Sequence, residues 1–365
     1  MQFSEKTVRV STPGRICLFG EHQDYLQLPV IAAAISRRVC IVGSRRTDRK
    51  VNIDLPDVRK RESFEISKQI RYVRERDYFR SAVNVLQRRG FEFSYGFDCT
   101  VKGNIPINAG MGSSSALTVC WVDFLSRLTD QQKELEPQEI AQIAHEAEVL
   151  EFSEPGGSMD HYSAAKGGVI WLESYPATRM SPMNVELKSF VVGNSNQPKD
   201  TKSVLANVKN KLLAIVNSVR KRHPGFSLQT VSRNELDAWR EEMRAEQFEL
   251  LAGTVRNRDI SFEARKVLEH SPLDHKRFGE LLNRHHAVLR DVLKISTPKI
   301  DRMIDAALNA GAYGGKINGS GGGGCMVAYA PENPDAVMEA VRTIGEASIV
   351  SIGEGSRLEE NTPEL

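Results

Sequence analysis

The sequence contains few cysteines, and no two of them form a C-x-x-C pair. The five are far apart and stand among apolar neighbours: Cys17, Cys40, Cys99, Cys120 and Cys325. This spacing excludes a small domain held together by disulfides. It predicts buried free thiols in a reducing cytoplasm.

Long apolar runs are missing as well. No stretch approaches the roughly 20 apolar residues that a bilayer-spanning helix needs. The first ten residues, MQFSEKTVRV, are an amphipathic, strand-like stretch without the apolar segment of an export signal. We therefore expect neither export nor contact with a membrane, and predict a cytoplasmic protein.

An excess of one charge is also absent, because 49 Lys and Arg residues face 47 Asp and Glu residues, a net charge of +2. This balance gives no electrostatic reason to expect a nucleic acid as a partner. The basic stretch at residues 71–89 is a local exception, but Glu75 and Asp77 within it indicate a solvated helix face. With 40% hydrophobic and 26% charged residues, the chain has the composition of a globular protein, which excludes long disorder.

The 365 residues are enough for about two domains. Residues 6–53 favour strands, whereas residues 202–310 have a helical period and are rich in Leu, Arg and Glu. Further helices are predicted at 113–128, 137–151 and from 334, and further strands at 97–101, 167–172, 185–192, 325–330 and 347–352. No linker of low complexity divides the chain, so we predict domains of residues 1–185 and 186–365 that meet in a structured crossing.

A glycine- and serine-rich loop, NAGMGSSSA, covers residues 108–116. Its glycines let the main chain pass close to a ligand, and a helix that follows them directs free N–H groups and a positive dipole end at that ligand. Serine hydroxyls can donate to phosphate oxygens or ligate Mg²⁺. The loop lacks the G-K-[ST] ending of a Walker A loop, and a serine-capped helix after a flexible turn fits it equally well. The candidate nucleotide-binding residues are Gly110, Gly112, Ser113, Ser114 and Ser115.

A second glycine-rich segment, KINGSGGGGC, covers residues 316–325 and holds five glycines in ten residues. Because glycine loses much backbone entropy on folding, we expect a packing or ligand reason for it. A crowded hairpin that touches the other domain is one explanation. Close approach of this segment to the first glycine-rich loop would explain both.

Polar side chains gather near the start of the chain, where Glu21, His22 and Asp24 follow a predicted strand. Three hydrogen-bonding groups of different type within four residues suit a small molecule with many hydroxyls, although an exposed polar turn is the alternative. A single acid, Asp160, ends the predicted loop PGGSMD. A lone loop aspartate is most often a cap or turn residue.

Taken together, three motifs resemble those of the GHMP kinase superfamily, which includes galactokinase, homoserine kinase and mevalonate kinase. They occur in the family's order as PGRICLFGEHQDY from Pro13, PINAGMGSSSA from Pro106 and KINGSGGGGC from Lys316, and the resemblance covers nearly the whole chain. It implies an α+β fold with a ribosomal-protein-S5-like N-terminal domain and a ferredoxin-like C-terminal domain with extra helices. It also implies ATP as the phosphoryl donor, Mg²⁺ as its metal and a site between the domains.

The first motif most resembles the galactokinase pattern GR-x-N-L-I-GEHTDY. This resemblance implies that Arg15 is an active-site arginine. It also implies that three residues bind sugar hydroxyls: Glu21, His22 and Asp24.

Around Asp160, the segment PGGSMDH resembles the galactokinase segment PCGIMDQ. The resemblance implies that Asp160 is the catalytic aspartate and that the Gly157 backbone contacts the sugar. Twelve positions before Asp160, Glu148 stands where the family keeps a Mg²⁺-ligating glutamate. Ser114 matches the magnesium-contacting serine of the second motif.

Other segments depart from the galactokinase pattern. Leu26–Pro29 replaces a polar stretch that contains glycine, and the tyrosine expected in the C-terminal half has no counterpart. The stretch after VELKSFVV resembles the P-x-x-T-x-x-L-V pattern of mevalonate kinase. That family, however, carries lysine where Arg15 stands and lacks the H-x-D-Y ending.

The resemblance therefore predicts a kinase that transfers the γ-phosphoryl group of ATP to a small-molecule sugar, at the anomeric hydroxyl. L-Arabinose, L-fucose, galacturonate and a heptose phosphate are alternative acceptors, and mevalonate is a further one. A catalytically silent sugar sensor is an alternative from another class. The intact GSSSA loop and Asp160 argue against such a sensor.

Overall fold

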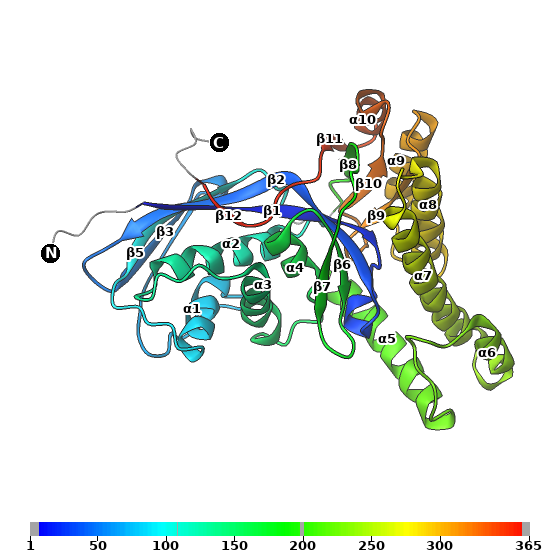
Figure 1. The fold of residues 1–365 in the computed structure, drawn as a ribbon, viewed down its shortest axis with the longest axis horizontal. Coiled ribbons are helices and arrows are strands. Elements are labelled where there is room, and N and C mark those ends of the chain that lie inside the picture. The colour runs from blue at the N-terminus through cyan, green and yellow to red at the C-terminus, as the bar shows by residue number, and fades with distance from the viewer. Residues whose placement is uncertain (1–6, 108, 198–200, 360–365) are drawn as a thin grey trace.

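The computed structural model describes residues 7–107, 109–197 and 201–359. Asn108, the first residue of the predicted glycine- and serine-rich loop, lies outside these ranges. Within them the strands form one eight-stranded and one four-stranded sheet, with helices packed on both (Figure 1). The predicted α+β fold class is confirmed.

The larger sheet is built mainly from the first half of the chain. Its strands are β1 Val8–Phe19, β2 Val30–Arg45, β3 Lys50–Leu55, β4 Lys60–Glu65, β5 Phe97–Gly103, β6 Val169–Glu173, β7 Arg179–Met183 and β12 Arg357–Leu358. They follow the order β12-β1-β2-β5-β3-β4, and β6 pairs with both β2 and β7. All pairs are antiparallel except β3 with β5. The strands predicted in residues 6–53, 97–101 and 167–172 are confirmed, except that Lys6 lies outside the described ranges and β6 begins at Val169.

Helices α1 Tyr78–Arg88, α2 Ser113–Leu128, α3 Pro137–His145 and α4 Met159–Lys166 cover one face of this sheet (Figure 1). Helix α2 has the predicted bounds. The helix predicted at 137–151 is α3 followed by a π-helical turn at Glu146–Leu150.

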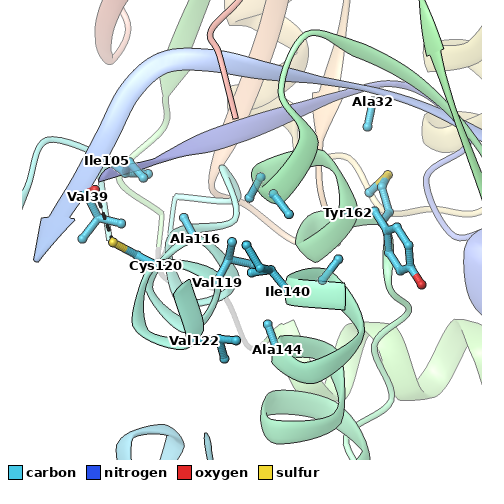
Figure 2. Close-up of a cluster of buried hydrophobic side chains, with 14 of the residues drawn as sticks. Ala32, Val39, Ile105, Ala116, Val119, Cys120, Val122, Ile140, Ala144 and Tyr162 are labelled. Carbon is cyan, nitrogen blue, oxygen red and sulfur yellow. Dashed lines mark hydrogen bonds between the residues drawn. The ribbon is translucent and has the colours of Figure 1, made fainter. Parts of the chain in front are cut away.

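Helix α2 lies at the centre of the core beneath this sheet. Its side chains at Ala116, Val119 and Val122 are fully buried, and they gather with Ile140 and Ala144 of α3 (Figure 2). The apolar spacing predicted the helix, but α2 is buried on nearly all sides: between Ser115 and Leu128 only Leu117 and Arg127 are not buried.

The cysteines belong to this apolar interior. All five are buried and free, as predicted. Cys120 on α2 directs its Sγ–H to the main-chain oxygens of Val10 at 3.4 Å and Val39 at 3.8 Å. Figure 2 shows the contact with Val39. These contacts join α2 to the two longest strands.

The smaller sheet belongs to the second half of the chain and is antiparallel throughout. Its strands run in the order β11-β8-β10-β9, with bounds β8 Phe190–Asn194, β9 Gly314–Asn318, β10 Cys325–Tyr329 and β11 Glu346–Val350. Its helices are α5 Thr201–Arg222, α6 Arg233–Ala238, α7 Ala245–Glu269, α8 His275–Asp291, α9 Pro298–Asn309 and α10 Pro334–Arg342. The helices predicted at 202–310 and from 334 are confirmed.

Two details of the second half differ from the sequence prediction. The strand predicted at 185–192 begins only at Phe190, and the N–H of Val185 bonds the main-chain oxygen of Met183 in a local turn. The glycine-rich segment begins as strand β9, whose residues 314–318 are all buried.

The chain returns to the larger sheet after β11. Ile352 bridges to Ile35, Glu354 bridges to Gly167, and β12 pairs with β1. The domain boundary predicted after residue 185 stays a prediction. Among the described helices, none combines the length and apolar character that crossing a membrane requires.

Candidate active site

All of the candidate residues named from the sequence line one cavity of about 380 Å³. They are Arg15, Glu21, His22, Asp24, Gly110, Gly112, Ser113, Ser114, Ser115, Glu148, Gly157 and Asp160. The end of β1, the first turns of α2 and α4, and the turn between β9 and β10 meet here. Residues up to 145 positions apart are thus brought together, although their predicted roles stay predictions.

Arg15 on β1 is buried and holds Asp160 by two hydrogen bonds. Its Nε donates to Asp160 Oδ1 at 2.7 Å and its Nη2 donates to Oδ2 at 2.5 Å, while Nη1 donates to the Gly110 oxygen at 2.6 Å. Burial is the largest single influence and favours a lower pKa for Arg15, but the charge and hydrogen bonds of Asp160, together with the nearby Cys17 and Glu21, raise it. The guanidinium therefore remains charged and neutralises the carboxylate beside it.

The structure corrects the predicted loop position of Asp160, which lies in the first turn of helix α4. The glycines that suggest a loop end at Gly157, before the helix begins at Met159. A carboxylate in the first turn also faces the positive end of the helix dipole.

Asp24 follows β1 in a short 3-10 turn, and its carboxylate packs against the backbone of Gly157. It accepts hydrogen bonds from the main-chain N–H groups of Tyr25 at 2.9 Å and Met159 at 3.4 Å. Burial, and then the nearby charge of Asp160, raise the pKa of Asp24 above its ordinary value. Among the described residues, no cationic side chain is within salt-bridge distance of this carboxylate.

Both ring nitrogens of His22 have partners. Nε2 donates to the main-chain oxygen of Ser320 at 2.9 Å, so Nδ1 accepts from the Tyr25 hydroxyl at 2.8 Å. His22 thereby ties the first motif to the second glycine-rich segment. Its predicted contact with a sugar hydroxyl stays a prediction.

Glu21 forms a buried ion pair with Lys316 on β9, a residue that the sequence reasoning did not assign to the site. Lys316 Nζ contacts Glu21 Oε1 and also donates to the main-chain oxygens of Cys17 and Ile317, both at 2.8 Å. Glu21 Oε2 lacks a hydrogen-bond partner in the described part of the chain. The one signal for Lys316 was its charge, the only one in a segment of glycines and small residues.

The two glycine-rich segments touch, which was one of the explanations offered for their glycines. Asn318 Nδ2 donates to the Gly110 oxygen at 2.8 Å, and a Cβ atom on Gly319 would lie 2.9 Å from the same oxygen. Gly112 has the positive φ of +69° just before α2 begins, so its backbone conformation favours glycine. The three serines then fall in the first turn of α2, where its free N–H groups point out of the helix.

Glu148 and Ser114 both line the cavity, and their oxygen atoms suit Mg²⁺. This ion is commonly held by one or two protein carboxylates together with substrate phosphates and water. Within the described ranges, no cluster of three or more His, Cys, Asp or Glu side chains could hold a metal ion. The donor set therefore fits a cation that arrives with a nucleotide better than a resident metal.

The cavity has a further wall that the sequence reasoning missed. Arg76, Tyr78 and Glu154 line it, and Arg76 donates to both carboxylate oxygens of Glu154 at 3.0 and 2.6 Å. Arg76 belongs to the basic stretch, whose Arg88 pairs with Glu151 in the same way. Carboxylates of residues 146–154 thus neutralise part of the positive charge of residues 71–89, in addition to the acids within that basic stretch.

Comparisons with known proteins place these residues in matched regions. Residues 77–168 match GHMP kinases N terminal domain, residues 264–347 match GHMP kinases C terminal, and residues 1–45 match the galactokinase galactose-binding signature. The mevalonate kinase of Pyrococcus furiosus is 30% identical, over 97% of this chain and 98% of its own. The galactokinase of Actinobacillus succinogenes is 29% identical, over 93% of this chain and 88% of its own.

A solved galactokinase and a solved mevalonate kinase are also similar to this chain, and of these two the galactokinase has the higher identity and TM-score. Lactococcus lactis galactokinase complexed with galactose superimposes with a TM-score of 0.86 at 25% identity, over 96% of this chain and 95% of its own. Methanococcus jannaschii mevalonate kinase gives a TM-score of 0.71 at 20% identity, over 97% of this chain and 100% of its own. The predicted two-domain fold is confirmed by these matches.

Proposed function

This chain belongs to the GHMP kinase family, a family of phosphotransferases, and we propose that it transfers the γ-phosphoryl group of ATP to a neutral, galactose-like sugar. The acceptor is the anomeric hydroxyl. The observation that carries this proposal is the environment of Asp24, because its carboxylate offers acceptors to hydroxyl groups and repels a second anion. The structural likeness to a galactokinase and the matched galactose-binding signature support it.

The charges around the cavity favour a neutral acceptor. Three of its acids are neutralised by a cation, Glu21 by Lys316, Asp160 by Arg15 and Glu154 by Arg76. Asp24 has only main-chain N–H donors in the described structure. A carboxylate-bearing acceptor placed here would meet an uncompensated like charge, which is costly at a buried site.

The phosphoryl donor would bind at the first turn of α2. Free main-chain N–H groups and the hydroxyls of Ser113–Ser115 supply donors to phosphate oxygens there, and the helix dipole favours their charge. Mg²⁺, held by Ser114 and Glu148 with the phosphates, would supply further charge neutralisation. Phosphoryl transfer needs mainly such positioning and electrostatic stabilisation.

Asp160 would accept the proton of the sugar hydroxyl as its oxygen forms the new bond to the γ-phosphorus, and ADP would leave with the bridging oxygen. Because Arg15 neutralises Asp160, we expect this carboxylate to orient the hydroxyl first and take the proton late in the transfer. Asp24 and the Gly157 backbone would hold the sugar. The five buried free thiols support a reducing cytoplasm as the compartment.

The test is a coupled ADP-release assay of the purified chain over galactose, L-arabinose, L-fucose, galacturonate, a heptose phosphate and mevalonate. We expect turnover with a neutral sugar and little with mevalonate. Asp24→Ala should weaken sugar binding by about 1–3 kcal/mol and leave ATP affinity unchanged, because a buried hydroxyl loses its acceptor. Removing the contacted hydroxyl from the sugar should weaken binding to the parent, and should weaken binding to Asp24→Ala much less, because the variant no longer makes that contact.

Mevalonate phosphorylation is the second candidate function. It is favoured by 30% identity to a mevalonate kinase over nearly the full length of both chains. Efficient turnover of mevalonate by the parent, unaffected by Asp24→Ala, would overturn the sugar proposal. The kinase assignment would stand in either case.

A further inference from the structure

His161 contacts Glu148, the glutamate proposed as a metal ligand, inside the protein. Its Nε2 lies 2.8 Å from Glu148 Oε2, and the histidine and glutamate side chains are only 1% and 8% exposed. A carboxylate oxygen can only accept here, so Nε2 carries the proton and donates. The other ring nitrogen, Nδ1, has no hydrogen-bond partner among the described residues.

Two consecutive residues of α4, Asp160 and His161, thus contact different walls of the cavity. Asp160 is paired with Arg15, whereas His161 turns to Glu148 in the π-helical turn after α3. The contact occupies one oxygen of Glu148, and no described donor contacts Oε1. A carboxylate fixed through one oxygen is restricted in rotation, and the other oxygen remains available to a cation.

We propose that His161 is a positioning residue that orients the Glu148 carboxylate for the divalent cation bound with the nucleotide phosphates. This inference rests on one part of the proposed function, the binding of a nucleotide together with a divalent cation. It does not depend on which acceptor is phosphorylated. Histidine stands here where the galactokinase segment PCGIMDQ has glutamine. A glutamine side chain also offers an N–H donor, at a reach similar to that of Nε2 of histidine.

The experiment measures Mn²⁺ binding to the full chain in the presence of ADP, from the electron paramagnetic resonance signal of free Mn²⁺. No acceptor and no turnover are involved. His161→Leu should weaken Mn²⁺ binding about tenfold, because partners of metal ligands typically contribute that much or more. His161→Gln should stay within about threefold of the parent, since its amide nitrogen reaches the position of Nε2.

A third variant covers the case in which the leucine variant does not fold. His161→Asn carries the same amide one methylene shorter, so it cannot reach Glu148, and it should bind Mn²⁺ as weakly as His161→Leu. If His161 had a purely structural role, the three variants would differ in melting temperature, and all of them would bind Mn²⁺ with the affinity of the parent. Equal affinity in parent and His161→Asn, or equal loss in the asparagine and glutamine variants, would overturn the inference.

His145 on α3 supplies a matched control. Its ring packs edge-to-face on His161 at 5.3 Å between centroids, and it is a partly buried histidine with no described bond to a carboxylate. His145→Leu should leave Mn²⁺ affinity unchanged, and a tenfold loss there would show that any change in this packing disturbs the metal. A parent that binds no Mn²⁺ with ADP also overturns the inference, whereas failure of every sugar in the ADP-release assay overturns only the proposed acceptor.

Discussion

Gly157 lies directly against the carboxylate of Asp24, and a Cβ atom on Gly157 would stand 1.9 Å from Asp24 Oδ2. The glycine is required here for space. The close approach joins the turn after β1 to the loop before α4. Any side chain at this position must displace the carboxylate that we propose as a sugar ligand.

Gly157→Ala should therefore reduce catalytic efficiency toward the sugar roughly 100-fold, as expected when a positioning group moves by about 1 Å. Nucleotide affinity should be unchanged. The neighbouring Gly156→Ala is the control, because its added Cβ would meet only Val149 at 3.9 Å. Steady-state kinetics of both variants check this, and equal effects of the two substitutions would contradict it.

Asp160→Asn should bind ATP normally and lose at least about 100-fold in turnover, because it removes the proton acceptor and keeps the shape. Turnover and nucleotide affinity are measured on the same preparations. Asp259→Asn, which removes the charged partner of Arg258 on α7, should leave turnover and nucleotide affinity unchanged. Turnover within a few-fold of the parent would remove Asp160 from the mechanism.

Asn318→Ala should weaken nucleotide binding by about 1–3 kcal/mol. The buried Asn318 amide donates to Gly110 and accepts from the Cys17 N–H at 2.8 Å, so its loss frees the serine loop and leaves polar groups unpaired. Calorimetric titration with ADP and thermal unfolding check the two effects. A variant that is less stable but binds ADP like the parent would show that the contact does not position the loop.

Asp24→Asn should be more stable than the parent at pH 7, and the difference should shrink as the pH falls. Burial raises the pKa of Asp24 in the folded chain above its ordinary value of 3.8. The folded state thus binds this proton more tightly than the unfolded state, and that stabilisation, complete below pH 3.8, is lost as the pH rises through the folded-state pKa. Urea unfolding of both proteins from pH 4 to 8 measures this, and a difference independent of pH would refute it.

The sequence predicted which residues gather around the cavity, because most of them stand in short contiguous motifs; their roles stay predictions. The first motif joins the end of β1 to a 3-10 turn, the second joins a turn to the start of α2, and the third joins β9 to β10. Such junctions have local signals. The glycines before α2 and the serines of its first turn indicated that the helix begins at Ser113. The apolar period that follows fixed its extent to Leu128.

The pairing of charges across the cavity could not be predicted in this way. Glu21 and Lys316 are 295 positions apart, and Arg76 and Glu154 are 78 apart. No periodicity connects positions that only tertiary packing brings together. Helix α4 was missed for a different reason, since eight residues behind a glycine pair are too few to show a helical period.

The pairing of β12 with β1 has a consequence for biosynthesis. Val10 and Ser11 find their partners in Leu358 and Arg357, so this edge of the larger sheet is covered by residues made about 350 positions later. On the ribosome, β1 can pair with β2 early, yet its other edge exposes unpaired N–H and C=O groups until β12 emerges. Such an open edge can recruit a strand of another chain. The nascent protein is therefore most exposed to faulty association during synthesis of its second half, after the residues of its proposed catalytic site up to Asp160 have already been made.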